Sequence, residues 1–250
     1  MIHLHLIGIG TGNPDHLTLQ AIKSLNAADL VMIPRKGDSK ADLAELRRAI
    51  CADVVRNDAT QIVEFDLPVR DLANPDYLAA VNDWHDAIAT VWQQTMLAHA
   101  GAVNVALLVW GDPSLYDSSL RIAGRLTMNV TVHIIPGITS IQGLTSAHGI
   151  PLNELGAAVT ITTGRQLQNG WPGDVDTLVI MLDGNCSFQH LDPAGVSIWW
   201  GAYIGMKQQI TISGDLAVVG PQIVERRGKA RAEHGWIMDI YLLRRNIHIT

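Results

Sequence analysis

Cysteine is scarce in this sequence, with only Cys51 and Cys186 among its 250 residues. Two isolated cysteines cannot form a disulfide framework, and neither has a partner at the short spacing of metal ligands. We therefore expect both thiols to be reduced and buried. His3 and His5 alternate along one predicted strand, but no third ligand accompanies them, and we predict no metal site.

A surplus of basic residues and a long apolar run are also missing. The chain has 18 Lys and Arg against 24 Asp and Glu, a net charge of −6 at pH 7, which gives no overall attraction for polyanions. No apolar run approaches the roughly 20 residues of a membrane span, and the first residues lack the basic segment and cleavage site of a signal peptide. We expect a cytoplasmic protein with neither nucleic acid nor a membrane as partner.

Short aliphatic runs alternate with longer helical patterns along the chain. With 48% hydrophobic and 17% charged residues, the sequence can form one large or two modest cores. The alternation predicts an α/β fold with a mainly parallel sheet. The predicted strands include 3–9, 29–34, 62–67, 103–110, 130–136 and 177–184, and the predicted helices include 15–28, 39–50 and 75–100.

Capping residues indicate where two of these helices begin. Asp38 or Ser39 can cap the helix that follows them, and Asn74 is expected to begin the long helix with Pro75 in its first turn. Gly101 is expected to end that helix.

The composition changes after residue 136, where short strands and glycines become more frequent. We place a domain boundary there. The prediction is an N-terminal α/β domain, residues 1–136, with a helical insertion at about 36–100, and a C-terminal α/β domain, residues 137–250.

The stretch IGIGTGNPDHLT, residues 7–18, sets alternate glycines between a predicted strand and a predicted helix. A dinucleotide-binding loop needs a third glycine where Asn13 stands and an acid ending the second strand, whereas Asp29 precedes that strand. Pro14 fits a first helical turn, and Asp15 beside it disfavours a phosphate. Two interpretations stay open: the glycines make a tight turn, or they let a ligand lie against bare backbone at the carboxyl edge of the sheet.

A second loop, LLVWGDPSLYDSS at residues 107–119, follows another predicted buried strand. Gly111 permits close approach of a ligand, Asp112 can accept a hydrogen bond from a ligand amine or hydroxyl, and Pro113 fixes the turn. Ser114 is expected to open a helix. Gly-Asp-Pro is common in turns, so an ordinary turn is the alternative.

Taken in order, five segments resemble the tetrapyrrole (corrin and precorrin) methylase family over nearly the whole chain: GIGTGNPDHLTLQAIKSLNAADLV, WGDPSLY, IIPGITSIQGLTSAHGIPL, TTGR and TLVIML. The resemblance implies two α/β domains with S-adenosylmethionine bound in the cleft between them, usually in a homodimer. The N-terminal segment, the long insertion before Gly111, the segment GWPGDVDTLVIMLDGNCSF and the segment HGWIMDIYLLRR look like those members that act in cobalamin biosynthesis, methylating precorrin-5 at C-1 and releasing acetate. S-adenosylhomocysteine is then the second product.

The resemblance also implies the cofactor contacts, position by position. The family's Gly-Asp-Pro loop and the Thr-Ser pair after Pro-Gly match positions between residues 110 and 140. A strand-end pair and a segment that closes over adenine match positions between residues 181 and 203. The implied contacts are Trp110, Gly111, Asp112, Leu115, Tyr116, Thr139, Ser140, Met181, Leu182, Ala202 and Tyr203.

Some positions depart from the family's pattern. Asn13 stands where many relatives have an aspartate that is proposed as an acid/base group, and an amide cannot take a proton at neutral pH. We therefore consider Asp15, one step further along, and Arg35, where relatives place a basic residue, as candidate catalytic residues. Asp183 replaces the usual small residue before Gly184. The substrate's acetate and propionate groups need cationic partners, for which the candidates are Arg35, Lys36, Arg121, Arg165 and Lys207.

Methyl transfer from a sulfonium to a ring carbon needs in-line placement and a dry site rather than a nucleophilic side chain. The sequence contains no Gly-x-Ser-x-Gly elbow and no zinc signature, in keeping with such chemistry. Two alternatives remain: a methylase of the same fold that acts on a different precorrin, and a module that binds a precorrin without catalysis.

Overall fold

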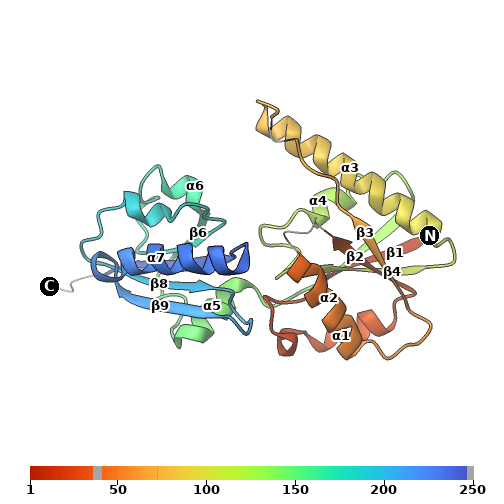
Figure 1. The fold of residues 1–250 in the computed structure, drawn as a ribbon, viewed down its shortest axis with the longest axis horizontal. Helices are drawn as coiled ribbons and strands as arrows, with labels where there is room; N and C mark the ends of the chain where they lie inside the picture. Colours follow the sequence, from red (N-terminus) through yellow and green to blue (C-terminus); the bar gives the residue numbers. More distant parts are fainter. Residues whose placement is uncertain (36–40, 72, 247–250) are drawn as a thin grey trace. The chain divides into compact units, whose positions relative to one another are not determined.

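The computed structural model describes residues 1–35, 41–71 and 73–246, in two compact units, Met1–Thr139 and Ser140–Thr250 (Figure 1). The boundary that we predict from sequence, between residues 136 and 137, lies close to this division. Each unit is an α/β layer structure built around its own five-stranded sheet. The expected α/β class is therefore confirmed.

The first unit contains a fully parallel sheet with helices on both faces. Its strands have the order β3-β2-β4-β1-β5. One core lies under helices α1 and α2 and the other under α3 and α4, on opposite sides of the sheet (Figure 1). The elements are β1 (Ile2–Gly8), α1 (Leu19–Asn26), β2 (Leu30–Arg35), α2 (Ala41–Val54), β3 (Gln61–Asp66), α3 (Tyr77–Ala98), β4 (Asn104–Val109), α4 (Ser119–Ala123) and β5 (Val130–Ile135).

β2 and β4 read as continuous apolar runs because helices cover both faces of this sheet. Leu30, Val31, Met32 and Ile33 are each at most 1% exposed. This is the pattern from which a buried strand can be predicted without any period-2 alternation.

The second unit contains a mixed sheet of order β6-β7-β10-β8-β9. Only β6 and β7 pair in parallel; the other three pairings are antiparallel, so the expectation of mainly parallel sheet is wrong for this unit. β8 and β9 are joined by residues 203–209 alone, too short a link for a parallel crossover. The elements are α5 (Ser140–His148), β6 (Val159–Thr163), α6 (Gly164–Leu167), β7 (Thr177–Met181), the 3-10 turn η3 (Ser187–His190), β8 (Val196–Ala202), β9 (Ile210–Asp215), α7 (Leu216–His234) and β10 (Asp239–Arg245).

The two Asn-Pro-Asp sequences do not begin α-helices as expected. The Asn13 side chain accepts from the Asp15 N–H at 3.0 Å, and Asn74 accepts from the Asp76 N–H at 2.9 Å. Each asparagine thereby closes an Asx turn that precedes the helix. Residues 14–16 form a separate 3-10 turn, η1 (Pro14–His16), and α1 starts only after Thr18.

The true N-caps are Thr18 for α1 and Asp76 for α3, each of which accepts a backbone N–H three residues on, at 3.0 Å. Ser114 also opens no helix, because Asp112 accepts its N–H in a third Asx turn at 2.8 Å. The expected caps of α2, Asp38 and Ser39, lie outside the described residues. Within the described part of the chain, no helix is long and apolar enough to cross a bilayer.

Candidate functional site

Three glycine-containing loops pack backbone to backbone at the carboxyl edge of the first sheet. They follow the neighbouring strands β4, β1 and β5. Gly10 and Gly111 form a bridge with N···O distances of 3.3 and 2.8 Å. A Cβ on Gly137 would lie 2.1 Å from the Gly111 oxygen, and a Cβ on Gly8 would lie 2.6 Å from the Gly137 nitrogen. Gly8 and Gly137 are therefore needed for the close approach of the three loops.

Gly111 differs from its neighbours in facing open space. Its φ is +67°, and a Cβ at this position would meet no atom within 4 Å. The residue thus combines a left-handed backbone with an unobstructed surface, which is the arrangement that lets a ligand lie against bare backbone.

Asp112 holds this loop cluster together. Its Oδ2 accepts from the Gly137 N–H at 2.8 Å, while Oδ1 accepts from the Ser114 N–H at 2.8 Å and from the Ser114 hydroxyl. Burial alone raises the pKa of Asp112, but these hydrogen bonds outweigh it and lower the pKa below its usual value. At 8% exposure, the side chain fixes the loops, and its expected contact with a ligand stays a prediction.

Strained backbone coincides with three of the predicted cofactor contacts. Among the described residues other than glycine, positive φ angles occur at Tyr116, Leu182, Cys186 and Tyr203. Such angles cost free energy in residues with a side chain and concentrate at functional sites. Tyr116 is 45% exposed and Leu182 is 67% exposed, so both present side chains at the surface of a strained turn.

In the second unit the predicted contacts gather at one edge of the sheet. β7 and β8 both run antiparallel to β10, so their carboxyl ends meet at the same edge. Met181 and Leu182 lie at the end of β7, and Ala202 and Tyr203 lie at the end of β8. Ala202 and Tyr203 are at most 1% exposed, and the Tyr203 ring packs edge-on against Trp236. The tyrosine ring is therefore part of the core, and its expected place beside adenine stays a prediction.

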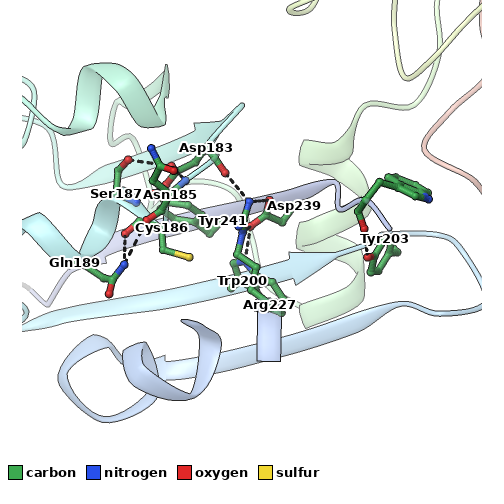
Figure 2. A network of polar contacts seen from close by, with 11 residues as sticks. Asp183, Asn185, Cys186, Ser187, Gln189, Trp200, Tyr203, Arg227, Asp239 and Tyr241 are labelled. Atoms are coloured by element: carbon green, nitrogen blue, oxygen red, sulfur yellow. Dashed lines mark hydrogen bonds and ion pairs between the residues drawn. The ribbon is translucent and has the colours of Figure 1, made fainter. Parts of the chain in front are cut away.

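A buried polar network fixes the turn that carries Leu182 (Figure 2). The Asp183 carboxylate accepts from the Ser187 N–H and the Tyr241 hydroxyl, both at 2.6 Å, from the Ser187 hydroxyl at 2.9 Å and from the Asn185 N–H at 3.0 Å. Burial alone raises the pKa of Asp183, but these donors together lower it. A Cβ on Gly164 would lie 2.4 Å from the carboxylate, so Gly164 makes room for the aspartate.

The network continues to a buried ion pair. Arg227 donates to Asp239 at 2.8 and 3.3 Å and to the Asp183 carbonyl oxygen at 3.0 Å, and the Trp200 indole donates to Asp239 at 3.0 Å (Figure 2). In the sequence, Asp183 stands out only as a departure from the family. The position of Arg227 in a basic amphipathic helix gives no sign of an inward-facing side chain.

The two candidate catalytic residues lie in the first unit. Asp15 is exposed in the η1 turn. Arg35, at the end of β2, donates to Asp66 at 2.8 Å and lies 3.6 Å from Glu64, so two carboxylates hold its half-exposed guanidinium in place. Thr139 ends the first unit and Ser140 begins α5, both half-buried. Of the candidate cationic partners, Lys36 lies outside the described residues and Arg121 donates to the Asp117 carbonyl oxygen at 2.9 Å.

The described residues include no group of three or more His, Cys, Asp or Glu side chains arranged to hold a metal ion. Both cysteines are buried, and burial raises the pKa of each thiol to about 11. Neither thiol is therefore a nucleophile at neutral pH.

The sequence profile of the tetrapyrrole (corrin/porphyrin) methylases matches residues 3–219. The chain belongs to this family. It is 48% identical to a precorrin-6A synthase [deacetylating] of Sinorhizobium sp. over 245 residues, covering 96% of this chain and 94% of that protein.

Solved structures agree with the fold. A putative cobalamin synthesis related protein (CobF) from Corynebacterium diphtheriae has a TM-score of 0.85 and 38% identity, over 99% of this chain and all of that one. A uroporphyrin-III C-methyltransferase from Thermus thermophilus, complexed with S-adenyl homocysteine, has a TM-score of 0.59 at 19% identity, over 99% of this chain and all of that one.

Proposed function

We propose that the chain is an S-adenosylmethionine-dependent C-methyltransferase of cobalamin biosynthesis, which methylates precorrin-5 at C-1, releases acetate and yields precorrin-6A. The observation that carries this proposal is the identity of 48% with a precorrin-6A synthase [deacetylating] across almost the whole of both chains. We further propose that the protein is a homodimer and is located in the cytoplasm. Light scattering of the purified protein tests the first point, and fractionation of cells tests the second.

The methyl donor is proposed to contact the exposed or open residues of the turns described above. Gly111 offers bare backbone, because a Cβ at this position would meet no atom within 4 Å. Tyr116 and Leu182 present exposed side chains from left-handed backbone. The remaining proposed contacts are Trp110, Asp112, Leu115, Thr139, Ser140, Met181, Ala202 and Tyr203. Asp112 also supports its turn through the Gly137 N–H.

When bound, S-adenosylmethionine supplies an electrophilic methyl group on a sulfonium. The protein's part is to orient the ring carbon in line with that methyl and to exclude water. Release of acetate further needs a water that attacks the acetyl carbonyl and a group that protonates the ring carbon as it leaves. Asp15 is proposed for this proton transfer because its carboxyl is exposed beside the glycine loop, and Arg35, held by Glu64 and Asp66, is proposed to bind a substrate carboxylate.

A second relative supports one rival. The chain is 32% identical over 152 residues to a precorrin-2 C(20)-methyltransferase of Sinorhizobium sp., covering 59% of each chain. Supplying S-adenosylmethionine with equal amounts of precorrin-2 and precorrin-5 distinguishes the two substrates. The proposal predicts methylation of precorrin-5 alone; methylation of precorrin-2 alone favours the rival, and donor binding without transfer to either contradicts both.

Leu182→Ala tests the donor contacts. Because Leu182 is 67% exposed, its truncation should leave the free energy of unfolding within about 0.5 kcal/mol of wild type. The dissociation constant of S-adenosylmethionine, measured by calorimetry, should rise about tenfold through lost apolar contact. Leu155→Ala is the matched control, since Leu155 is an exposed leucine of the same unit. An equal effect of both variants on donor affinity would remove Leu182 from the site.

A further inference from the structure

Strands β2 and β4 separate from each other at their carboxyl ends. Their pairing stops at Met32 and Leu107, whereas β2 stays paired with β3 as far as Arg35 and β4 stays paired with β1 as far as Val109. Pro34, in the separated part of β2, has no N–H to donate to a neighbouring strand. A crevice therefore opens inside the first sheet, between two of its central strands.

This crevice lies at a topological switch point of the sheet. In the order β3-β2-β4-β1-β5, the chain leaves β2 toward β3 on one side and, after β4, continues to β5 on the other side. Neighbouring strands whose connections depart in opposite directions leave a crevice at their carboxyl ends, which is where open α/β sheets bind ligands. The strand pairing alone therefore places the crevice where such sheets generally bind ligands.

A cavity of about 170 Å³ occupies the crevice. Trp84, Ile88 and Trp92, spaced four residues apart on one face of α3, form an apolar wall, and Trp110 and Asp117 belong to the loop that follows β4. Since a water molecule fills about 30 Å³ in the liquid, the cavity has ample room for a two- or three-carbon acid side chain.

The cavity contains a cation without a carboxylate partner. Arg47, from α2, donates through Nε to the Leu108 carbonyl and through Nη1 to the Leu43 carbonyl, both at 3.1 Å. No ion pair of Arg47 and no acceptor for its Nη2 occur among the described residues. Burial lowers the pKa of Arg47 to about 10, despite the attraction of Asp117, so the guanidinium remains charged at neutral pH.

A residue that lines the cavity carries a second donor without an acceptor. Trp92 is 3% exposed, and its indole N–H has no partner in the described part of the protein. An unpaired buried donor costs free energy, which a ligand acceptor recovers. Asp117, the acidic side chain that lines the cavity, has its Oδ1 occupied by the Ser119 N–H at 2.6 Å.

We propose that the β2–β4 crevice is a carboxylate subsite, in which Arg47 and the Trp92 N–H bind the carboxylate of one acetate side chain of the tetrapyrrole. This inference rests on the proposed function for the identity of the substrate. The apolar wall suits the methylene of such a group, and the two unsatisfied donors suit its two oxygens. Arg47 anchors the subsite because its two bonds to backbone carbonyls fix the guanidinium without neutralising it.

Binding of free acetate tests the subsite without any turnover. Tryptophan fluorescence of the whole protein should respond saturably to sodium acetate, because three tryptophans line the cavity, and not to acetamide, its neutral isostere. Arg47→Met should abolish the response, Arg47→Lys should weaken it, and Arg48→Met should leave it unchanged. Arg48 is the matched control because it is the next residue of α2, is half-exposed and pairs with Glu64.

Trp92→Phe is a second variant that tests the subsite even if the Arg47 variants do not fold. It breaks no hydrogen bond found in the described part of the fold, and it should weaken acetate binding about tenfold, the effect of one hydrogen bond to a charged group, while unfolding stays cooperative. Saturable acetate binding that persists in Arg47→Met, or its absence from the wild-type protein, overturns the subsite.

Kinetics and donor binding then show whether the bound carboxylate belongs to the substrate or to the methyl donor. Arg47→Met should raise KM for precorrin-5 at least tenfold and leave the dissociation constant of S-adenosylmethionine unchanged. A rise in the donor's dissociation constant instead would assign the carboxylate to the donor and overturn the substrate assignment. Acetate binding that depends on Arg47 in a protein that does not methylate precorrin-5 would support the subsite and refute the proposed function.

Discussion

At the scale of single residues, the loops at the edge of the first sheet need glycine at two positions and a carboxylate at a third. Gly8 and Gly137 allow three backbones to meet, and Asp112 then ties the loops through the Gly137 N–H. Gly8 and Gly10 in the first loop are packed closely against their neighbours, whereas Gly111 in the second loop faces open space. That a ligand lies against Gly111 stays a prediction.

Gly137→Ala should destabilise the protein strongly. The new Cβ would lie 2.1 Å from the Gly111 carbonyl oxygen, and because this neighbour is backbone, relief requires the loops to separate. We expect a loss of about 3 kcal/mol in the free energy of unfolding, measured in urea.

Gly101→Ala is its control, since a Cβ there meets nothing within 4 Å, and it should change the free energy by less than about 0.5 kcal/mol. Similar values for the two variants would show that the loops are not tightly packed.

Asp183 should make stability depend on pH in the acid range. Its pKa in the folded protein lies below the usual value, so the carboxylate stabilises the fold at pH values above about 3.9, its unfolded pKa. This contribution is lost as the pH falls through the lower, folded pKa. Asp183→Asn should cost about 3 kcal/mol at pH 7, because it disrupts a buried hydrogen-bonded charge.

The difference between wild type and Asp183→Asn should narrow as the pH falls below 4, because the native carboxyl then also becomes neutral. Urea unfolding of both proteins between pH 7 and pH 2.5 checks this. Parallel curves with a constant gap would show that Asp183 contributes through shape and not through charge.

At the scale of elements, the Asx-Pro sequences show how local side-chain bonds compete with helix formation. Asp76, not Asn74, caps α3. Asp76→Ala should therefore cost about 1 kcal/mol. Asn74→Ala should cost less than half as much, since it removes only a turn outside the helix. Thermal unfolding followed by circular dichroism compares them, and the reverse order would restore Asn74 as the cap.

The strands of the first unit could be predicted because each is a short buried run whose signal is local, such as Leu107 and Leu108 in β4. The antiparallel partners of β10 could not be predicted, because its place between β7 and β8 is decided by segments more than 35 residues away.

In the site, too, local features can be predicted from sequence and long-range contacts cannot. The loop with Gly111 is recognisable in sequence, but the partner of Asp112 lies 25 residues further on, and Arg47 reaches its cavity through a strand separation that no local pattern encodes.

At the scale of the whole molecule, family membership and the near-complete match to a precorrin-6A synthase agree with two α/β units whose predicted contacts include strained or open turns. The claim that joins these observations is that the protein both methylates and deacylates its substrate. A fold alone cannot establish this, because related folds carry different chemistries.

Mass spectrometry after incubation of the purified protein with S-adenosylmethionine and precorrin-5 tests that claim most directly. We expect a corrinoid product with one added methyl group and without the two-carbon acetyl unit, together with equimolar acetate and S-adenosylhomocysteine. A methylated product that retains the acetyl unit, with no free acetate, would contradict it.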